Sequence, residues 1–501
     1  MAKKKVLFVV LPYVVERPST ETRVHSYAAF PYGALSIATY NKGLADFRIL
    51  DLNFYRDCPD ITLELYIREY RPDIIGFTMM FDNSYPLLNQ LLDLSWSVDP
   101  NAIRILGGAA ASYSYKEILK DQPLLDAICY SEGEVPMRSL LTHGNFSDPA
   151  WVTKGKLDPP TISYLEDLDQ VVDLDYGLVD INGYKMKEAF SPFSDERRSK
   201  FFLVTSRGCP FECTYCANAK IHGQKMRFAS VDRIIAHVDR MVKEYGMDTL
   251  TIYDDQLLIR MGRAKELFRK LAPYKLRIEC PNGLSVTFID EEMAGLMKQA
   301  GMDTIYLAVE NGSDYVLHKL MRKPINLACV KPAVEALRNN GIFVIGFFVM
   351  GMPGETDAHR RETSLFINDV GFDWCFFNPV VPFRGSPLYD ECIDKGYIEK
   401  TGIGERVIGS YSDRESYFIK VPGIDPGEVF DKIYNMNIEL NFHNNYRMKI
   451  GDYETAAKCF KEVLKRSQGH KWAQDYLSLC ERKMYESDRR VSPGKNKEAE
   501  W

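Results

Sequence analysis

The sequence predicts an α/β protein in three parts: a doubly wound parallel sheet, a partial (β/α)6 TIM-like barrel and a C-terminal helical region. Two observations predict the sheet and the barrel. Short apolar runs alternate with amphipathic stretches over residues 1–145, and the same alternation resumes, about six times, over residues 195–395. A third observation predicts the last part, because β-like runs vanish from about residue 426 onward.

The composition is that of a folded chain of about three domains. Among its 501 residues 46% are hydrophobic and 26% charged, which excludes a wholly disordered chain. The net charge of −6 argues against a broad nucleic-acid-binding surface. The odd number of cysteines, 11, spread over all regions, indicates a reducing compartment rather than a disulfide framework. No apolar run reaches the ~18 residues of a membrane span.

The first residues could be taken for a signal peptide, because three lysines at 3–5 precede the apolar run 6–10. Pro12 interrupts that run and no small-residue cleavage site follows closely, so the pattern favours a first buried β-strand. We therefore expect a cytoplasmic protein, and a monomer.

The first region predicts a parallel sheet with crossover helices on both faces. Such sheets bind ligands at the carboxyl ends of their strands, where Gly107 and Gly108 follow the fourth strand and Glu132, Gly133 and Glu134 follow the fifth. A glycine pair can equally well satisfy loop geometry alone. We expect strands at 6–11, 48–52, 74–79, 103–106 and 127–130, and helices near 33–42, 61–70, 85–97 and 113–119.

The middle region carries three cysteines at CxxxCxxC spacing, Cys209, Cys213 and Cys216, directly after an apolar strand at 201–205. Three thiolates on one loop can hold three irons of a [4Fe-4S] cluster. No fourth cysteine lies nearby, so the fourth iron stays open and can chelate S-adenosylmethionine (SAM), whose reductive cleavage releases a 5′-deoxyadenosyl radical. A structural zinc site would need four closed ligands, and the next cysteine is Cys280.

Repeated helix–strand units follow, which predicts a barrel with its functional groups at the carboxyl ends of the strands. Asp254, Asp255, Glu310 and the turn 351–355 all fall at such ends. We expect helices at 231–245, 264–271, 291–299, 330–339 and 359–368, and strands at 249–253, 277–280, 304–309, 343–348 and 374–378.

Residues 195–390 resemble the radical SAM core of the cobalamin-linked subgroup. The resemblance implies that Tyr215 lies near the adenine and that Glu310 binds the ribose of SAM. It also places Asp254 and Asp255 at the mouth of the cavity, although they could instead cap the next helix. The remaining residues implied to line the adenosine pocket are Gly346, Phe347, Gly351, Gly354 and Glu355, the last of which could also be a helix N-terminal charge.

Residues 1–145 resemble the cobalamin-binding domain that precedes such a core, through the segments PYGAL at 31–35, PDIIGF at 72–77, LGGA at 106–109 and SEGE at 131–134. Many such domains carry D-x-H-x-x-G, whose His ligates cobalt. Here Arg23 and Ala28 occupy the motif positions on either side of His25, so ligation of cobalt by His25 is not supported. The loop 79–82 is the alternative segment to cover the lower face of the cobalamin. The resemblance implies cobalamin contacts from Gly107, Gly108, Glu132, Gly133, Glu134, Met79 and Met80.

The remaining segments are a linker at 146–194, which holds Pro159 and Pro160, a helical region at 396–486 and a disordered tail at 487–501. Helices are expected over 429–446, from 451 onward and over 472–485. The stretch GDYETAAKCF at 451–460 resembles half of a tetratricopeptide repeat. A single copy favours a lid or buttress on the barrel over a protein-docking module.

The two resemblances together imply a cobalamin-dependent radical SAM enzyme that methylates an unactivated carbon of a small molecule or peptide. A flavodoxin or ferredoxin would be the electron donor, and nucleic acid would not be a partner. Three alternatives stay open at this point. The enzyme could cyclise, rearrange or oxidise its substrate without methyl transfer, it could lack cobalamin, or the chain could be a non-catalytic metal-binding scaffold.

Overall fold

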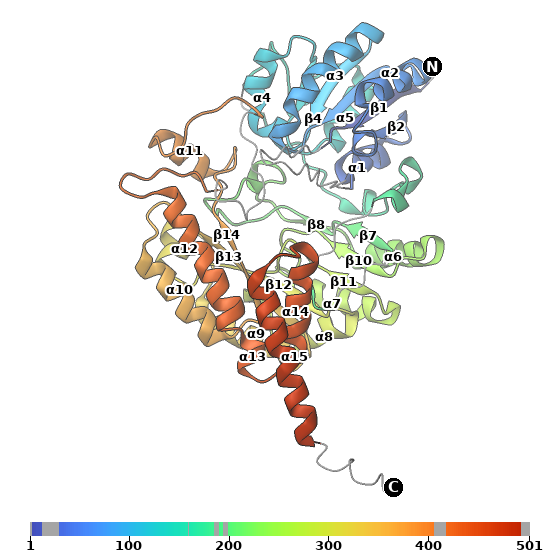
Figure 1. The fold of residues 1–501 in the computed structure, drawn as a ribbon. Helices are drawn as coiled ribbons and strands as arrows, with labels where there is room; N and C mark the ends of the chain where they lie inside the picture. Colours follow the sequence, from blue (N-terminus) through green and yellow to red (C-terminus); the bar gives the residue numbers. More distant parts are fainter. Residues whose placement is uncertain are drawn as a thin grey trace, which may run out of the picture.

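The computed structural model describes residues 3–12, 30–158, 160–184, 190–193, 199–404 and 417–491. It confirms the α/β class, with parallel strands in the first two parts and a helical C-terminal part (Figure 1). His25, Pro159 and the tail beyond 491 lie outside the described residues. Within these ranges, no helix is both long and apolar enough to span a membrane.

The first sheet has the strand order β2-β1-β3-β4-β5-β6 and is parallel except for β6. Its central strand β1 is apolar, and Val6, Leu7 and Val9 are fully buried, as a strand covered on both faces requires. The order reverses between β1 and β3, and sheets of this kind bind ligands at the carboxyl ends of the strands beside such a reversal. The strands are β1 Lys4–Val10, β2 Ala45–Asp51, β3 Ile74–Thr78, β4 Ile103–Gly107, β5 Ala127–Cys129 and β6 Trp151–Val152.

Helices cover both faces of this sheet, as the sequence predicts. Helices α1 and α5 pack on one face with the side chains of Val6 and Phe8, and α2, α3 and α4 pack on the other with Leu7 and Val9. Helix α5 and strand β6 were not expected. The helices are α1 Tyr32–Asn41, α2 Pro59–Tyr70, α3 Tyr85–Val98, α4 Ala109–Asp121 and α5 Glu134–His143. We call this sheet and its helices the N-terminal domain.

The barrel consists of two three-stranded parallel sheets, β11-β10-β7 and β12-β13-β14, linked by a parallel bridge between Leu284 and Leu307. Its strands therefore follow one another in chain order around an open arc. They are β7 Lys200–Leu203, β10 Thr249–Ile252, β11 Arg277–Glu279, β12 Thr304–Glu310, β13 Phe343–Met350 and β14 Trp374–Pro379.

The helices of the barrel begin and end at residues suited to those positions. Ser230 and Asp290 accept N-cap hydrogen bonds, and Gly246 and Gly301 end the same two helices in the left-handed conformation. The helices are α6 Val231–Tyr245, α7 Met261–Leu271, α8 Glu291–Ala300, α9 Val330–Asn339, α10 Asp357–Val370 and α11 Pro387–Asp394.

The C-terminal helices pack as a buttress against the barrel (Figure 1). Phe442 contacts both Trp374 of β14 and Phe460 of α14, with ring centroids 5.7 and 5.4 Å away. The single helix expected over 429–446 is interrupted, because Asn445 caps a new helix. Helix α15 also continues to Val491, past the expected helix end at 485 and into the segment 487–501 that was expected to be a disordered tail. The helices are α12 Pro426–Ile438, α13 Tyr446–Lys449, α14 Tyr453–Arg466 and α15 Lys471–Val491.

Candidate functional site

The three cysteines lie on one folded loop, residues 208–226, between the short antiparallel strands β8 (Ser206–Arg207) and β9 (Arg227–Phe228). We call this segment the Cys loop. Gly208 has φ of +92°, and a Cβ there would lie 2.3 Å from the carbonyl oxygen of Lys225, so only glycine fits. The Cys209 N–H donates to the Gly223 carbonyl at 3.1 Å, and the Cys216 N–H donates to the Cys213 carbonyl at 3.2 Å.

The thiols of the Cys loop affect one another electrostatically. Burial raises the pKa of Cys209 and Cys213 and raises that of Cys216 to about 11, and the neighbouring sulfurs add to the last effect. Hydrogen bonding from the Asn218 backbone lowers the pKa of Cys216, which favours the thiolate that an iron needs. All eleven cysteines are free, and no three His, Cys, Asp or Glu side chains in the described part of the chain surround a single ion. Three sulfurs on one loop suit a cluster in which each binds a different iron.

Alanine at position 208 is expected to weaken iron retention by the Cys loop. The added Cβ must displace the Lys225 backbone or change the φ of residue 208, and either change costs about 1–3 kcal/mol of local stability. Iron content after anaerobic reconstitution measures the effect. Gly262→Ala is the control, because nothing lies within 4 Å of a Cβ at that helical position. Equal iron content in both variants would contradict the argument.

Glu310 lies at the strained end of β12. Its φ is +74°, and the register of β12 shifts between Ala308 and Glu310. Its carboxylate accepts a hydrogen bond from Lys323 Nζ at 3.0 Å. Burial and the Glu310 charge raise the pKa of Tyr215 far above its usual range, and Glu310 also raises that of Cys213. One site therefore contains Glu310, Tyr215 and the Cys loop. Lys323 supplies a cation to this site, and the sequence analysis missed it.

The turn after β13 is shaped by Glu355. The Glu355 carboxylate accepts hydrogen bonds from the backbone N–H groups of Gly351 and, at 3.0 Å, Met352. Gly351 and Gly354 have φ of +89° and +92°. Tyr417 closes the turn by donating its hydroxyl to the Gly351 carbonyl at 2.8 Å. Burial raises the pKa of Glu355. In this structure Glu355 thus holds the conformation of the turn itself.

Gly346 and Phe347, in the middle of β13, face opposite sides of the barrel wall. The Phe347 ring packs against Tyr306 and Phe376, with centroids 5.1 and 5.8 Å away, on the inner side. A Cβ on Gly346 would lie 2.6 Å from the Phe348 ring in the outer core, between sheet and helices. Phe347 is therefore the side chain of this pair that lines the interior.

The two aspartates after β10 have different surroundings. Asp254 is buried and accepts hydrogen bonds from the Thr205 backbone and hydroxyl and, at 2.7 Å, from Ser206, so it ties β10 to the chain that enters the Cys loop. Burial raises the pKa of Asp255, and hydrogen bonding from Asn218 lowers it. The charge of Asp255 in turn raises the pKa of Cys216. Asp255 therefore faces the Cys loop. Neither caps α7, whose N-cap is Arg260.

The loops after β3 and β4 contact each other at the carboxyl ends of these strands in the N-terminal domain. The Met79 N–H donates to the Gly107 carbonyl at 2.8 Å, and a Cβ on Gly108, whose φ is +104°, would lie 2.4 Å from the Met79 carbonyl oxygen. Gly108 is thus required by the close approach of two loops. Met79 is fully buried, whereas Met80 is 50% exposed and is available to a ligand.

The carboxylates after β5 are paired with the barrel. Glu132 binds Arg227 at 2.6 and 2.7 Å, and Glu134 binds Arg207 at 2.8 Å. Gly133 between them packs closely on Ile37. Because a buried carboxylate needs a partner, both are held by arginines that flank the Cys loop instead of being free at the sheet edge.

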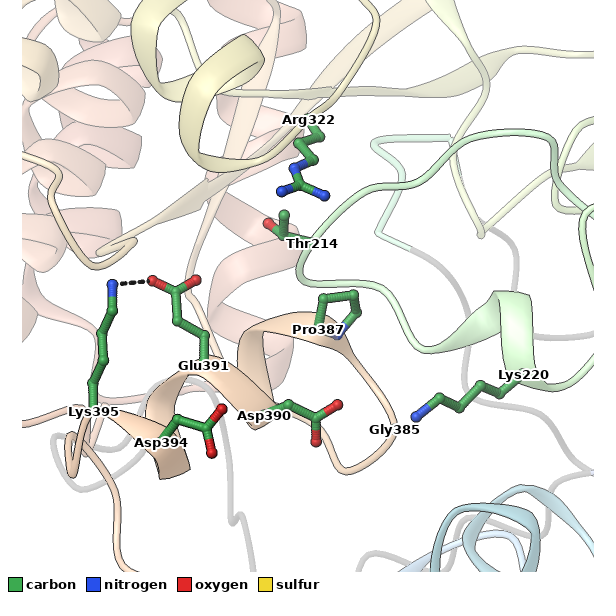
Figure 2. Close-up of a pocket in the computed structure, with 9 residues that line it drawn as sticks. All are labelled: Thr214, Lys220, Arg322, Gly385, Pro387, Asp390, Glu391, Asp394 and Lys395. Carbon is green, nitrogen blue, oxygen red and sulfur yellow. Dashed lines mark hydrogen bonds and ion pairs between the residues drawn. The ribbon is translucent and has the colours of Figure 1, made fainter. Parts of the chain in front are cut away.

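A cavity of about 490 Å³ lies between the Cys loop and α11 (Figure 2). Its wall carries both signs of charge, and one pair, Lys395 with Glu391, is joined at 2.6 Å. Sequence reasoning assigned a role to none of these residues, although Thr214 lies inside the CxxxCxxC motif. They are Thr214, Lys220, Arg322, Gly385, Pro387, Asp390, Glu391, Asp394 and Lys395.

Comparison with known proteins shows the family to which the chain belongs. The family model of the radical SAM superfamily matches residues 203–367, and that of the B12 binding domain matches residues 23–141. The chain is 31% identical to cytidylyl-2-hydroxyethylphosphonate methyltransferase of Streptomyces wedmorensis over 72% of this chain and 73% of that one. The chain therefore belongs to the radical SAM superfamily, in the group that carries a B12-binding domain.

Solved structures share the fold. The radical SAM methyltransferase TsrM of Kitasatospora setae, with cobalamin and a [4Fe-4S] cluster bound, superposes with a TM-score of 0.65 at 16% identity over 88% of this chain and 89% of that one. The radical enzyme OxsB, with aqua-cobalamin and SAM bound, gives a TM-score of 0.62 at 16% identity over 99% and 82%.

These findings make the protein a cobalamin-dependent radical SAM enzyme of the methyltransferase-like kind. Its cofactors are a [4Fe-4S] cluster, SAM and cobalamin. Neither the cobalamin-free enzyme nor the non-catalytic scaffold is favoured.

Proposed function

We propose that the enzyme methylates an unactivated carbon of a small-molecule substrate. The observation that carries the proposal is the contact between the Cys loop and the N-terminal domain. Ser131 donates its hydroxyl to the Ile221 carbonyl, and Tyr113 donates to the Ala217 carbonyl at 3.4 Å. Since one domain is of the B12-binding family and the other of the radical SAM family, this contact supports a shared boundary at which the two cofactors would meet. The methyltransferase at 31% identity supports the same reaction class.

The residues suit these cofactors. Cys209, Cys213 and Cys216 would hold the cluster, with Tyr215, Glu310 and Phe347 on the SAM side and Met80, Gly107 and Gly108 at the cobalamin crevice. When bound, SAM supplies a 5′-deoxyadenosyl radical and cobalamin supplies a methyl group. The chain binds and orients them and keeps water from the boundary. A flavodoxin or ferredoxin would deliver the electron.

Labelled SAM tests the proposal. The reconstituted enzyme is incubated anaerobically with a reductant, methyl-deuterated SAM and cytidylyl-2-hydroxyethylphosphonate, the compound in the relative's name, followed by other small molecules. We expect a product with a deuterated methyl group, formed together with 5′-deoxyadenosine and S-adenosylhomocysteine. A changed substrate that carries no label, formed with 5′-deoxyadenosine alone, would replace methylation by cyclisation, rearrangement or oxidation.

A further inference from the structure

Two arginines bracket the Cys loop. Arg207 of β8 and Arg227 of β9 lie directly opposite each other in the antiparallel pair, and the whole loop runs between them. Both side chains are almost fully buried, 4% and 2% exposed. Like charges directly opposite each other destabilise a strand pair, and burial strengthens the repulsion. The ends of the Cys loop therefore separate unless an anion lies between them.

The N-terminal domain supplies that anion. Glu132 binds Arg227 with both carboxylate oxygens, at 2.6 and 2.7 Å, and lies 3.4 Å from Arg207. Its side chain is only 2% exposed. Glu134 adds a second contact to Arg207 at 2.8 Å. One carboxylate from outside the barrel thus joins the two residues that directly flank the Cys loop.

Glu132 also reaches the interior of the Cys loop. Its Oε1 lies 3.0 Å from Nδ1 of His222, and the Arg227 guanidinium donates to the His222 carbonyl at 3.1 Å. Burial opposes the charge of Glu132, but Arg227, His222 and Arg207 together hold its pKa well below its usual range. The carboxylate is therefore charged at neutral pH and fixes the start, the interior and the end of the loop.

We propose that Glu132 is a positioning residue through which the N-terminal domain holds the Cys loop in the shape that retains the iron–sulfur cluster. The domain is then a structural part of the cluster site as well as the binder of the second cofactor. The proposal rests on a cluster at the Cys loop but not on methyl transfer, and its test measures no product, so the two can fail independently.

Glu132→Gln in the full chain tests the proposal, because it keeps the shape of the side chain and removes its charge. Removing one charge of a buried pair leaves the other charge unpaired and is strongly destabilising, and part of that loss falls on the Cys loop. We expect iron content after anaerobic reconstitution to fall at least about tenfold, while cobalamin content stays near wild type. In the metal-free protein, proteolytic cleavage within 208–226 should be at least about tenfold faster.

Glu166→Gln is the matched control. Glu166 pairs with Lys225 of the same loop at 2.7 Å, but both side chains are more than half exposed. Loss of this ion pair should therefore change neither the iron content nor the rate of cleavage within 208–226. Iron content and cleavage in Glu132→Gln equal to those of this control, or equal loss of iron and cobalamin, would overturn the proposal. If Glu132→Gln does not fold, Glu132→Asp, whose shorter side chain cannot keep the double contact to Arg227, decides. Cleavage within 208–226 of the metal-free protein that is faster than in Glu166→Gln supports the proposal, and equal cleavage overturns it.

Discussion

Cys213→Ala is expected to abolish the iron–sulfur cluster and with it the cleavage of SAM. Cys213 is the middle ligand of the three, and the loop that carries it offers no further thiol. With two thiolates left, a [4Fe-4S] cluster has two open irons and dissociates. We expect iron content to fall from about four per chain to near zero. Formation of 5′-deoxyadenosine should fall by at least ~10³-fold, the scale of losing the radical source.

Cys329→Ala controls for the loss of a thiol as such, since Cys329 is partly buried and lies before α9, outside the Cys loop. It should retain full iron content and activity. A Cys213→Ala protein that still binds about four irons and cleaves SAM would show that the cluster is held elsewhere.

The second large effect is expected from Gly108→Ala in the N-terminal domain. Its left-handed φ of +104° and the 2.4 Å approach of a Cβ to the Met79 carbonyl oxygen leave no room for a side chain. The loops after β3 and β4 must move apart, at a cost of about 1–3 kcal/mol. Because the proposed function places cobalamin at these loops, the ratio of cobalt to iron should fall by about tenfold.

Metal analysis of the reconstituted protein, together with the thermal midpoint of unfolding, measures this effect. Gly43→Ala is the control, because a Cβ there has no neighbour within 4 Å and the residue is not in the left-handed region. An unchanged cobalt-to-iron ratio in Gly108→Ala would place cobalamin away from the ends of β3 and β4.

The fold was predictable because its elements repeat short-range patterns. Alternating apolar runs located the strands of the N-terminal domain and of the barrel to within a few residues. The cysteine spacing alone predicted three sulfurs on one loop. Strand β6 was missed because two residues are too few to show a period. The helix expected over 429–446 exists as α12 and a π-helical turn at Glu439–His443, but it ends three residues early because Asn445 caps a new helix.

The site was less predictable, because it depends on partners distant in sequence. The resemblance predicts Glu132 as a cofactor contact, but nothing near it in the sequence indicates its partner Arg227, 95 residues further along the chain. Lys323, which pairs with Glu310, belongs to no motif, so nothing in the sequence indicated it. Met79 and Met80 look alike in sequence, yet one is fully buried and the other is 50% exposed.

The central claim is that the Cys loop holds an iron–sulfur cluster with one iron open to SAM, beside a domain that holds cobalamin. Metal analysis of anaerobically reconstituted protein, with electron paramagnetic resonance of the reduced sample before and after SAM is added, tests it most directly. The account predicts about four irons and about one cobalt per chain and a cluster spectrum that changes on adding SAM. A single zinc ion without iron, or a spectrum indifferent to SAM, would contradict it.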